Sequence, residues 1–292
     1  MNIQKNIPLA GFSTFSVGGT ADFFAEIRDK NDLLSAVDFA KSRHLKPFFL
    51  GGGSNILFSD RGFRGIIFHF QNQKILFKND EIVAESGAKN AEIFTFAKKV
   101  SRDFSAFLNV PGTIGGAVFG NAGTPAAEIG DFVAAAELFD FSKNNFFIAE
   151  KDFFRFEYRK SFLKKNPNLI LWKIFLKLPE KNPAEIEKSA KNFVKKRHET
   201  QPIGKTGGSF FKNPEKGAAG FFLEKAGFRG RKIGGAFFSE KHANFLMNDG
   251  TATQKDLLDL ARAAKKAVFE KFGVSLENEI RIFDEWGGEI RV

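Results

Sequence analysis

The placement of its glycines constrains the fold of this chain more than any other feature. Gly51-Gly52-Gly53-Ser54-Asn55 follows the apolar run Phe48-Phe49-Leu50, and a second glycine-dense segment, Pro111–Ala117, continues to Gly120-Asn121-Ala122-Gly123. Consecutive glycines let backbone N–H groups converge on an anion, because no Cβ blocks the approach. Neither segment is a P-loop or a G-x-G-x-x-G motif. The pattern therefore predicts either tight turns or a cradle for an extended cofactor that contains a diphosphate.

Helices and strands alternate along the chain, as the spacing of its apolar residues indicates. Helical spacing covers Asp29–Leu45, Ala91–Phe104, Ala184–Arg197 and Thr253–Phe272, and apolar runs predict strands at residues 48–50, 66–68, 82–84, 133–141 and 169–178. The segment Leu178–Pro183, in which two prolines bracket charged residues, has the composition of a linker. We expect an α+β fold with a larger unit up to about residue 180 and a smaller α/β unit after it.

Composition narrows the classes of function that the chain can have. It contains no Cys, which excludes disulfides, iron–sulfur clusters and thiolate metal sites, and its four His are scattered, so we expect no metal site. No apolar stretch reaches the roughly 20 residues of a membrane span, and the first residues lack a signal-peptide core, which favours a cytoplasmic protein. The net charge of +10 suits anionic partners. Because no nucleic-acid-binding motif accompanies it, we expect phosphorylated small molecules rather than nucleic acid.

Two further segments carry side chains that could do chemistry. Ser209 follows two glycines, so its hydroxyl could donate a proton, act as a nucleophile, or cap a turn; the segment is not the G-x-S-x-G elbow of hydrolases. If residues 276–282 form a strand, Glu277, Glu279 and Arg281 share one face. Such a face is either an acid/base and carboxylate-binding pair or a solvated surface with ion pairs.

Taken together and in this order, the motifs resemble the UDP-N-acetylenolpyruvoylglucosamine reductase family, also called UDP-N-acetylmuramate dehydrogenase. The resemblance runs from Phe15 to Ile282 and matches the shorter subtype of the family, which lacks an inserted loop over the substrate. The matching segments are Phe15–Gly19, Leu50–Asn55, Pro111–Ala117, Tyr158–Ser161, Gly208–Pro214, Ile233–Ala236, Lys241–Ala243 and Glu277–Arg281.

The resemblance implies a fold and a reaction. Residues 1–180 would form an FAD-binding domain of the vanillyl-alcohol-oxidase (PCMH) type with two α+β lobes. Residues 181–292 would form a substrate-binding domain, whose C-terminal strand returns to the active site. NADPH would reduce non-covalently bound FAD, and the enzyme would then reduce the enolpyruvyl double bond of UDP-N-acetylglucosamine enolpyruvate to UDP-N-acetylmuramate, for peptidoglycan synthesis. We expect a cytoplasmic monomer that uses no metal.

The resemblance also implies roles for individual residues. Arg159 and Glu279 would stabilise the charge that develops on the substrate carboxylate, and Ser209 would deliver a proton to carbon. Tyr158, Arg197 and Asn213 would contact the nucleotide-sugar. The expected FAD-binding residues are Gly51, Gly52, Gly53, Ser54, Asn55, Pro111, Gly112, Thr113, Gly115 and Gly116.

Some positions depart from the family pattern. After Asn121-Ala122-Gly123 the family usually continues Ala-Tyr-Gly, whereas this chain has Thr124-Pro125-Ala126, and Tyr158 is its only tyrosine. Two alternatives stay open at this point. One is a different flavin oxidoreductase of the same fold, and the other is a basic nucleic-acid-binding or scaffold protein without flavin; a visible absorbance spectrum separates the second from the rest.

Overall fold

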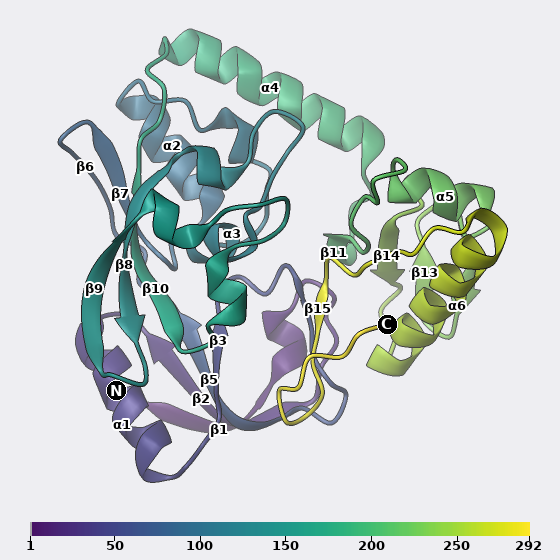
Figure 1. The fold of residues 1–292 in the computed structure, drawn as a ribbon, viewed down its shortest axis with the longest axis horizontal. Helices are drawn as coiled ribbons and strands as arrows, with labels where there is room; N and C mark the ends of the chain where they lie inside the picture. Colours follow the sequence, from purple (N-terminus) through teal and green to yellow (C-terminus); the bar gives the residue numbers. More distant parts are fainter. Residues whose placement is uncertain (1) are drawn as a thin grey trace.

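The first lobe of the structure is a four-stranded sheet covered by one helix. The computed structural model describes residues 2–292 (Figure 1). The sheet has the order β1 (Ile3–Pro8), β2 (Thr20–Ile27), β5 (Phe63–Phe70), β3 (Pro47–Leu50), in which β1 is antiparallel and the other pairs are parallel. Helix α1 (Lys30–Ser42) begins where the Asp29 side chain accepts the N–H of Asp32, and it buries Leu33, Val37 and its alanines on the sheet.

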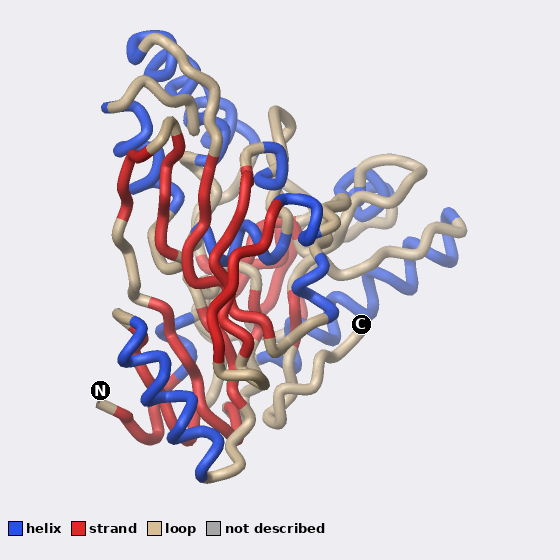
Figure 2. The backbone as a smooth tube through the Cα atoms, turned by 60° about the vertical axis from the view of Figure 1, so that its left-hand side comes forward, coloured by secondary structure: helices blue, strands red, loops and turns tan. Residues whose placement is uncertain are grey.

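The second lobe is a five-stranded antiparallel sheet with the order β6 (Ile75–Lys78), β7 (Glu81–Glu85), β10 (Leu169–Leu176), β8 (Val133–Asp140), β9 (Asn145–Glu150). Helices α2 (Asn90–Lys99) and α3 (Ile114–Gly120) pack on it. Phe139, Ile170 and Trp172 of this sheet also join the core of α1 and the first sheet. The two sheets therefore lie side by side over a shared core (Figure 2).

The third part of the chain has its own small sheet, and its core also includes Phe15, Val17 and Leu57 of the first lobe. Its strands are antiparallel in the order β11 (Lys205–Ser209), β14 (Phe245–Asn248), β13 (Ala236–Phe238), β12 (Lys232–Ile233), and helices α5 (Ala219–Lys225) and α6 (Gln254–Phe272) pack against them. A capping box of Thr253 and Asp256 starts α6, and Gly273 in the left-handed region ends it.

Helix α4 (Pro183–Thr200) connects the second lobe to the third part (Figure 1). Its buried residues Ile186 and Ala190 belong to the core of the second lobe, so the helix is anchored on that lobe. We still propose a domain boundary at residue 180.

The helix expected over Ala91–Phe104 is shorter than predicted, because α2 ends at Lys99 and Phe104 precedes a separate 3-10 turn at Ser105–Phe107.

After α6 the chain returns to the first lobe. Strand β15 (Arg281–Ile282) pairs in parallel with β4 (Ile56–Leu57), which directly follows the first glycine-rich segment. The C-terminal segment thus lies against the end of that segment. Within residues 2–292, no helix is both long enough and apolar enough to cross a membrane, and no group of three or more His, Asp or Glu side chains could hold a metal ion.

Candidate active site

The two glycine-rich segments predicted from the sequence meet in space. We call residues 51–55, which follow β3, and residues 111–113, which precede α3, the glycine cradle. A Cβ on Gly52 would lie 2.6 Å from the Cα of Gly112, so the two backbones are too close for side chains. The Ser54 hydroxyl ties the segments together by donating a hydrogen bond to the carbonyl of Pro111 at 3.0 Å. The two segments therefore form one feature rather than two separate turns.

The glycine cradle has the donors that an anionic cofactor needs. Within residues 2–292, the N–H groups of Gly52, Gly53, Ser54, Gly112 and Thr113 make no hydrogen bond to other protein groups. The adjoining cavity of about 340 Å³ has no acidic side chain in its wall. The wall also includes Asn109, whose buried Nδ2 has no partner. Free backbone donors and an unpaired amide beside a wall without carboxylates suit a diphosphate-containing group such as FAD.

The remaining predicted FAD-binding residues have different surroundings. Asn55 reaches out of the glycine cradle, while Gly115 packs against Ser86 and Gly116 donates its N–H to the Thr113 hydroxyl at 3.3 Å. Gly115 and Gly116 therefore lie in the first turn of α3, where Thr113 is the N-cap. Their part in binding FAD stays a prediction.

Replacing Gly112 with alanine is expected to lower FAD affinity. Gly112 has φ +103°, and a Cβ there would lie 2.6 Å from the Ser54 oxygen that links the two segments. Strain of this kind costs about 1–2 kcal/mol, or roughly tenfold in affinity. The measurement is the flavin released by acid precipitation per mole of protein. In the control Gly120→Ala, the new Cβ meets nothing within 4 Å, and flavin content should not change. Equal flavin content and affinity in both variants would contradict the role of Gly112.

Asn55 links the glycine cradle to the C-terminal segment. Its side-chain amide donates to the carbonyl of Glu279 at 3.2 Å, and its own carbonyl accepts the N–H of Arg281 at 3.1 Å. These two bonds fix the backbone on both sides of Ile280. Asn55 therefore places the Glu279 side chain relative to the cradle.

Arg159 and Glu279 form an ion pair at this place. Arg159 Nε donates to Glu279 Oε1 at 2.6 Å, and the side chains are only 19% and 22% exposed. The guanidinium also donates from Nη2 to the carbonyl of Gly123 at 3.1 Å, and Nη1 lies 3.9 Å from a carboxylate oxygen of Glu128. The backbone of Arg159 has φ +55°, a left-handed conformation that is uncommon for a residue with a side chain and is often found at functional sites.

Ser209 ends β11 on the segment next to Glu279. The N–H of Glu279 donates to the carbonyl of Phe210 at 2.8 Å, so the two predicted catalytic residues come from hydrogen-bonded neighbouring segments. Ser209 is partly exposed, and within residues 2–292 its hydroxyl makes no hydrogen bond to another protein group. The hydroxyl does not cap a turn, and it is free to donate to a ligand.

The strand predicted over residues 276–282 is wrong for most of its length. Only Arg281–Ile282 is a strand, because its partner β4 is two residues long, and the segment before it bonds instead to residues 210–212. The expected common face is therefore absent. Glu277 pairs with Lys212 at 3.1 Å, whereas Arg281 pairs with Glu289 at 3.0 Å. Neither contacts Glu279, whose partner is Arg159.

The three predicted substrate-binding residues have different surroundings. The Tyr158 ring is exposed and lies 5.0 Å from the Arg159 guanidinium carbon. Asn213 uses its Oδ1 to accept the N–H of Ala219 at 3.0 Å. Arg197, in the last turn of α4, has no hydrogen bond or ion pair through its guanidinium within residues 2–292, and burial lowers its pKa. An unpaired, partly buried guanidinium suits an anionic ligand such as a diphosphate.

The sequence analysis missed the role of the Gly120–Gly123 segment. Asn121 is buried, and its Nδ2 donates to Glu128 at 2.7 Å and to the carbonyl of Glu157 at 2.9 Å. A Cβ on Gly123 would lie 2.6 Å from Arg159 Nη1. The segment therefore does not extend the glycine cradle, but makes room for Arg159 and holds its turn. The sequence did contain one signal for this turn. Among residues with a side chain, asparagine is the one that most readily adopts the left-handed conformation that ends a helix.

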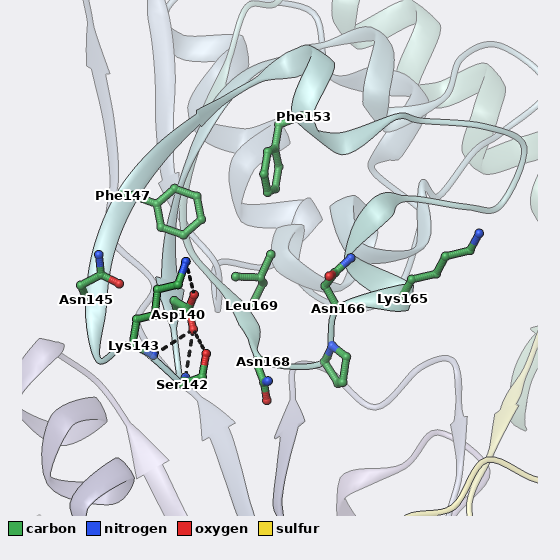
Figure 3. A pocket seen from close by; sticks show the side chains of 11 residues that line it. Asp140, Ser142, Lys143, Asn145, Phe147, Phe153, Lys165, Asn166, Asn168 and Leu169 are labelled. Carbon is green, nitrogen blue, oxygen red and sulfur yellow. Dashed lines mark hydrogen bonds and ion pairs between the residues drawn. The ribbon is translucent and has the colours of Figure 1, made fainter.

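A second cavity, of about 590 Å³, lies elsewhere on the second lobe (Figure 3). Its wall includes Lys143, Phe147, Phe153 and Lys165, but none of the predicted site residues. Its acidic residue, Asp140, accepts hydrogen bonds from Ser142 and from the N–H of Lys143 at 3.1 Å, so it stabilises the turn between β8 and β9. Free backbone donors and paired charges converge instead at the glycine cradle and the Arg159–Glu279 pair.

Two family models and several relatives of known name match this chain. A family model described as "UDP-N-acetylenolpyruvoylglucosamine reductase, C-terminal domain" matches residues 199–283, and one described as "FAD binding domain" matches residues 21–143. The UDP-N-acetylenolpyruvoylglucosamine reductase of Aquifex aeolicus is 37% identical over 304 residues, which cover 99% of this chain and 98% of the relative. The reductase of the same name from Clostridioides difficile is 35% identical and covers 97% and 94%.

A solved structure agrees over nearly the whole chain. The crystal structure of UDP-N-acetylenolpyruvylglucosamine reductase from Thermus caldophilus superposes with a TM-score of 0.84 at 29% identity, covering 98% of this chain and 99% of that one. The α+β fold with an N-terminal FAD-binding domain, predicted from the sequence, is confirmed.

Proposed function

Since the chain belongs to the UDP-N-acetylenolpyruvoylglucosamine reductase family, we propose that Arg159, Ser209 and Glu279 carry out the reaction of that family in this protein. The protein is an FAD-containing, NADPH-dependent oxidoreductase. It reduces the enolpyruvyl double bond of UDP-N-acetylglucosamine enolpyruvate to UDP-N-acetylmuramate in peptidoglycan precursor synthesis.

The positions of Arg159, Ser209 and Glu279 relative to one another support their assignment as catalytic residues. The Arg159–Glu279 pair, at 2.6 Å, joins a turn of the second lobe to the C-terminal segment, and Asn55 of the glycine cradle holds that same segment. Ser209 stands on the neighbouring strand with a free hydroxyl. Residues far apart in the sequence thus converge beside the place that suits FAD.

These side chains can divide the chemistry between them. The glycine cradle would hold FAD, which would supply the hydride. Arg159 binds the substrate carboxylate and offsets the negative charge that develops there during reduction. Glu279, beside it, would donate a hydrogen bond to the same oxygens when its carboxyl group is protonated. Ser209 would give its proton to the alkene carbon that does not receive the hydride. The unpaired Arg197 is suited to the diphosphate of the substrate, and Tyr158 and Asn213 to the nucleotide-sugar.

The finer features of the proposal concern cofactor attachment, assembly and location. FAD binds without a covalent link to sulfur, since the chain has no cysteine. We propose that the protein acts as a monomer, without a metal ion. A cytoplasmic location is supported by its use of NADPH.

Replacing Arg159 with lysine tests the proposal. Lysine keeps the positive charge, but one ammonium cannot reach Glu279, the Gly123 carbonyl and Glu128 together. We expect kcat for substrate reduction to fall by about 10²-fold at unchanged flavin content. Arg155→Lys is the matched control, because Arg155 is exposed, is also left-handed and makes no ion pair within residues 2–292. Wild-type kcat in Arg159→Lys would refute the assignment.

A further inference from the structure

One half-buried cation beside the Arg159–Glu279 pair has no acidic partner. Lys164 lies in the 3-10 turn Phe162–Lys165, close to Arg281, Lys212, Glu279 and Glu289. Arg159, Lys212 and Arg281 are paired with Glu279, Glu277 and Glu289 respectively. Within residues 2–292, Lys164 forms no ion pair. Its ammonium instead donates to the backbone carbonyl of Arg159 at 2.7 Å.

The hydrogen bond from Lys164 is made to a residue whose backbone conformation is unfavourable. Arg159 occupies a tight turn in which Glu157 and Lys160 exchange backbone hydrogen bonds of 3.2 and 2.9 Å. Its φ of +55° lies in the left-handed region, which is unfavourable for an arginine unless its surroundings hold it there. Lys164 contacts the Arg159 carbonyl itself, and a charged donor makes a stronger hydrogen bond than a neutral one.

We propose that Lys164 is a positioning residue whose ammonium holds Arg159 in its left-handed conformation and so directs the guanidinium toward Glu279 and the substrate carboxylate. This inference rests on the proposed function of Arg159.

The positive charge of Lys164 lowers the stability of the folded protein. Burial, together with the positive charges of Arg281 and Lys212, lowers the pKa of Lys164 to about 8, although Glu279 and Glu289 act in the opposite direction. Because this value lies below the usual 10.5, the charged ammonium destabilises the folded protein fully below pH 8. The cost is lost as the pH rises from about 8 toward 10.5. A residue kept only for stability would not carry this cost.

Lys164→Met is the main test, with Lys165→Met as its matched control on an exposed neighbour. At pH 7 we expect kcat to fall at least tenfold in Lys164→Met, with a melting temperature equal to or above that of the wild type and unchanged flavin content. Lys164→Gln, which keeps a neutral N–H donor, should have an intermediate kcat. In the wild type, kcat should decline as the pH rises through about 8, and this decline should be absent in Lys164→Met.

The outcomes separate this inference from the proposal beneath it. Wild-type kcat and an unchanged pH profile in Lys164→Met, alongside a slow Arg159→Lys, would overturn only the role of Lys164. If kcat fell in both Lys164 variants strictly in step with thermal stability, Lys164 would be a purely structural residue, and the inference would also be overturned. Wild-type kcat in Arg159→Lys would overturn both proposals.

Discussion

Ser209→Ala is expected to lose substrate reduction while keeping the reduction of FAD by NADPH. The proposed proton donor acts on substrate carbon only, so it has no part in the first half-reaction. We expect a loss of about 2–4 kcal/mol in the second half-reaction, or roughly 30- to 10³-fold in rate. Stability should barely change, because the Ser209 hydroxyl makes no hydrogen bond to another protein group within residues 2–292.

Single-turnover kinetics separates the two half-reactions of this variant. Ser275→Ala is a suitable control, because Ser275 is exposed on the segment that leads to Glu279. That control should match the wild type in both half-reactions. If Ser209→Ala reduced UDP-N-acetylglucosamine enolpyruvate at the wild-type rate, Ser209 could not be the proton donor.

Glu279→Gln is expected to slow substrate reduction by about 10²-fold and to leave the fold intact. Glutamine keeps the size of the side chain and can still hydrogen-bond, but it carries no negative charge to pair with Arg159 and cannot titrate. The main-chain bonds that fix residue 279 run to Phe210 and Asn55, so they do not depend on its carboxylate. The rate at which substrate is reduced in a single turnover measures the effect.

Glu277→Gln is the internal control for this prediction. The Glu277 side chain is 75% exposed, and the hydrogen bond from Lys212 lowers the pKa of its carboxyl. The ion pair contributes stability above the usual pKa and loses it as the pH falls through the lowered value, but exposure keeps this contribution small. We expect stability within about 0.5 kcal/mol of the wild type and nearly unchanged turnover. Equal rates of substrate reduction in the two variants would refute the catalytic role of Glu279.

Local signals allowed much of the fold to be predicted. The capping box at Thr253 and the glycine at position 273 fix the ends of α6, and the prediction for this helix agrees with the structure to within one residue. Residue type also allowed the glycine-rich segments to meet, since a close approach of two backbones requires residues without side chains, but the pattern alone left separate turns equally open. The family resemblance then correctly identified the enzyme.

Other features depend on contacts that one sequence does not reveal. Nothing in the sequence distinguishes Lys164 from Lys165, because only the folded turn brings the Lys164 ammonium to the Arg159 carbonyl. The residue pattern alone missed the partner of Glu279 for the same reason, since Arg159 is distant in the chain and the strand pattern pointed to Arg281, whereas the resemblance placed Arg159 and Glu279 at the same substrate group. The roles of individual residues toward FAD and substrate stay predictions.

A crystal structure of the oxidised, FAD-loaded protein with bound UDP-N-acetylglucosamine enolpyruvate would test the central claim most directly. The account predicts that the substrate carboxylate lies within hydrogen-bonding distance of the Arg159 guanidinium, with Glu279 beside it and the Ser209 hydroxyl facing the alkene. A substrate bound in the second cavity, between Lys143 and Lys165, or with its carboxylate away from Arg159, would contradict it.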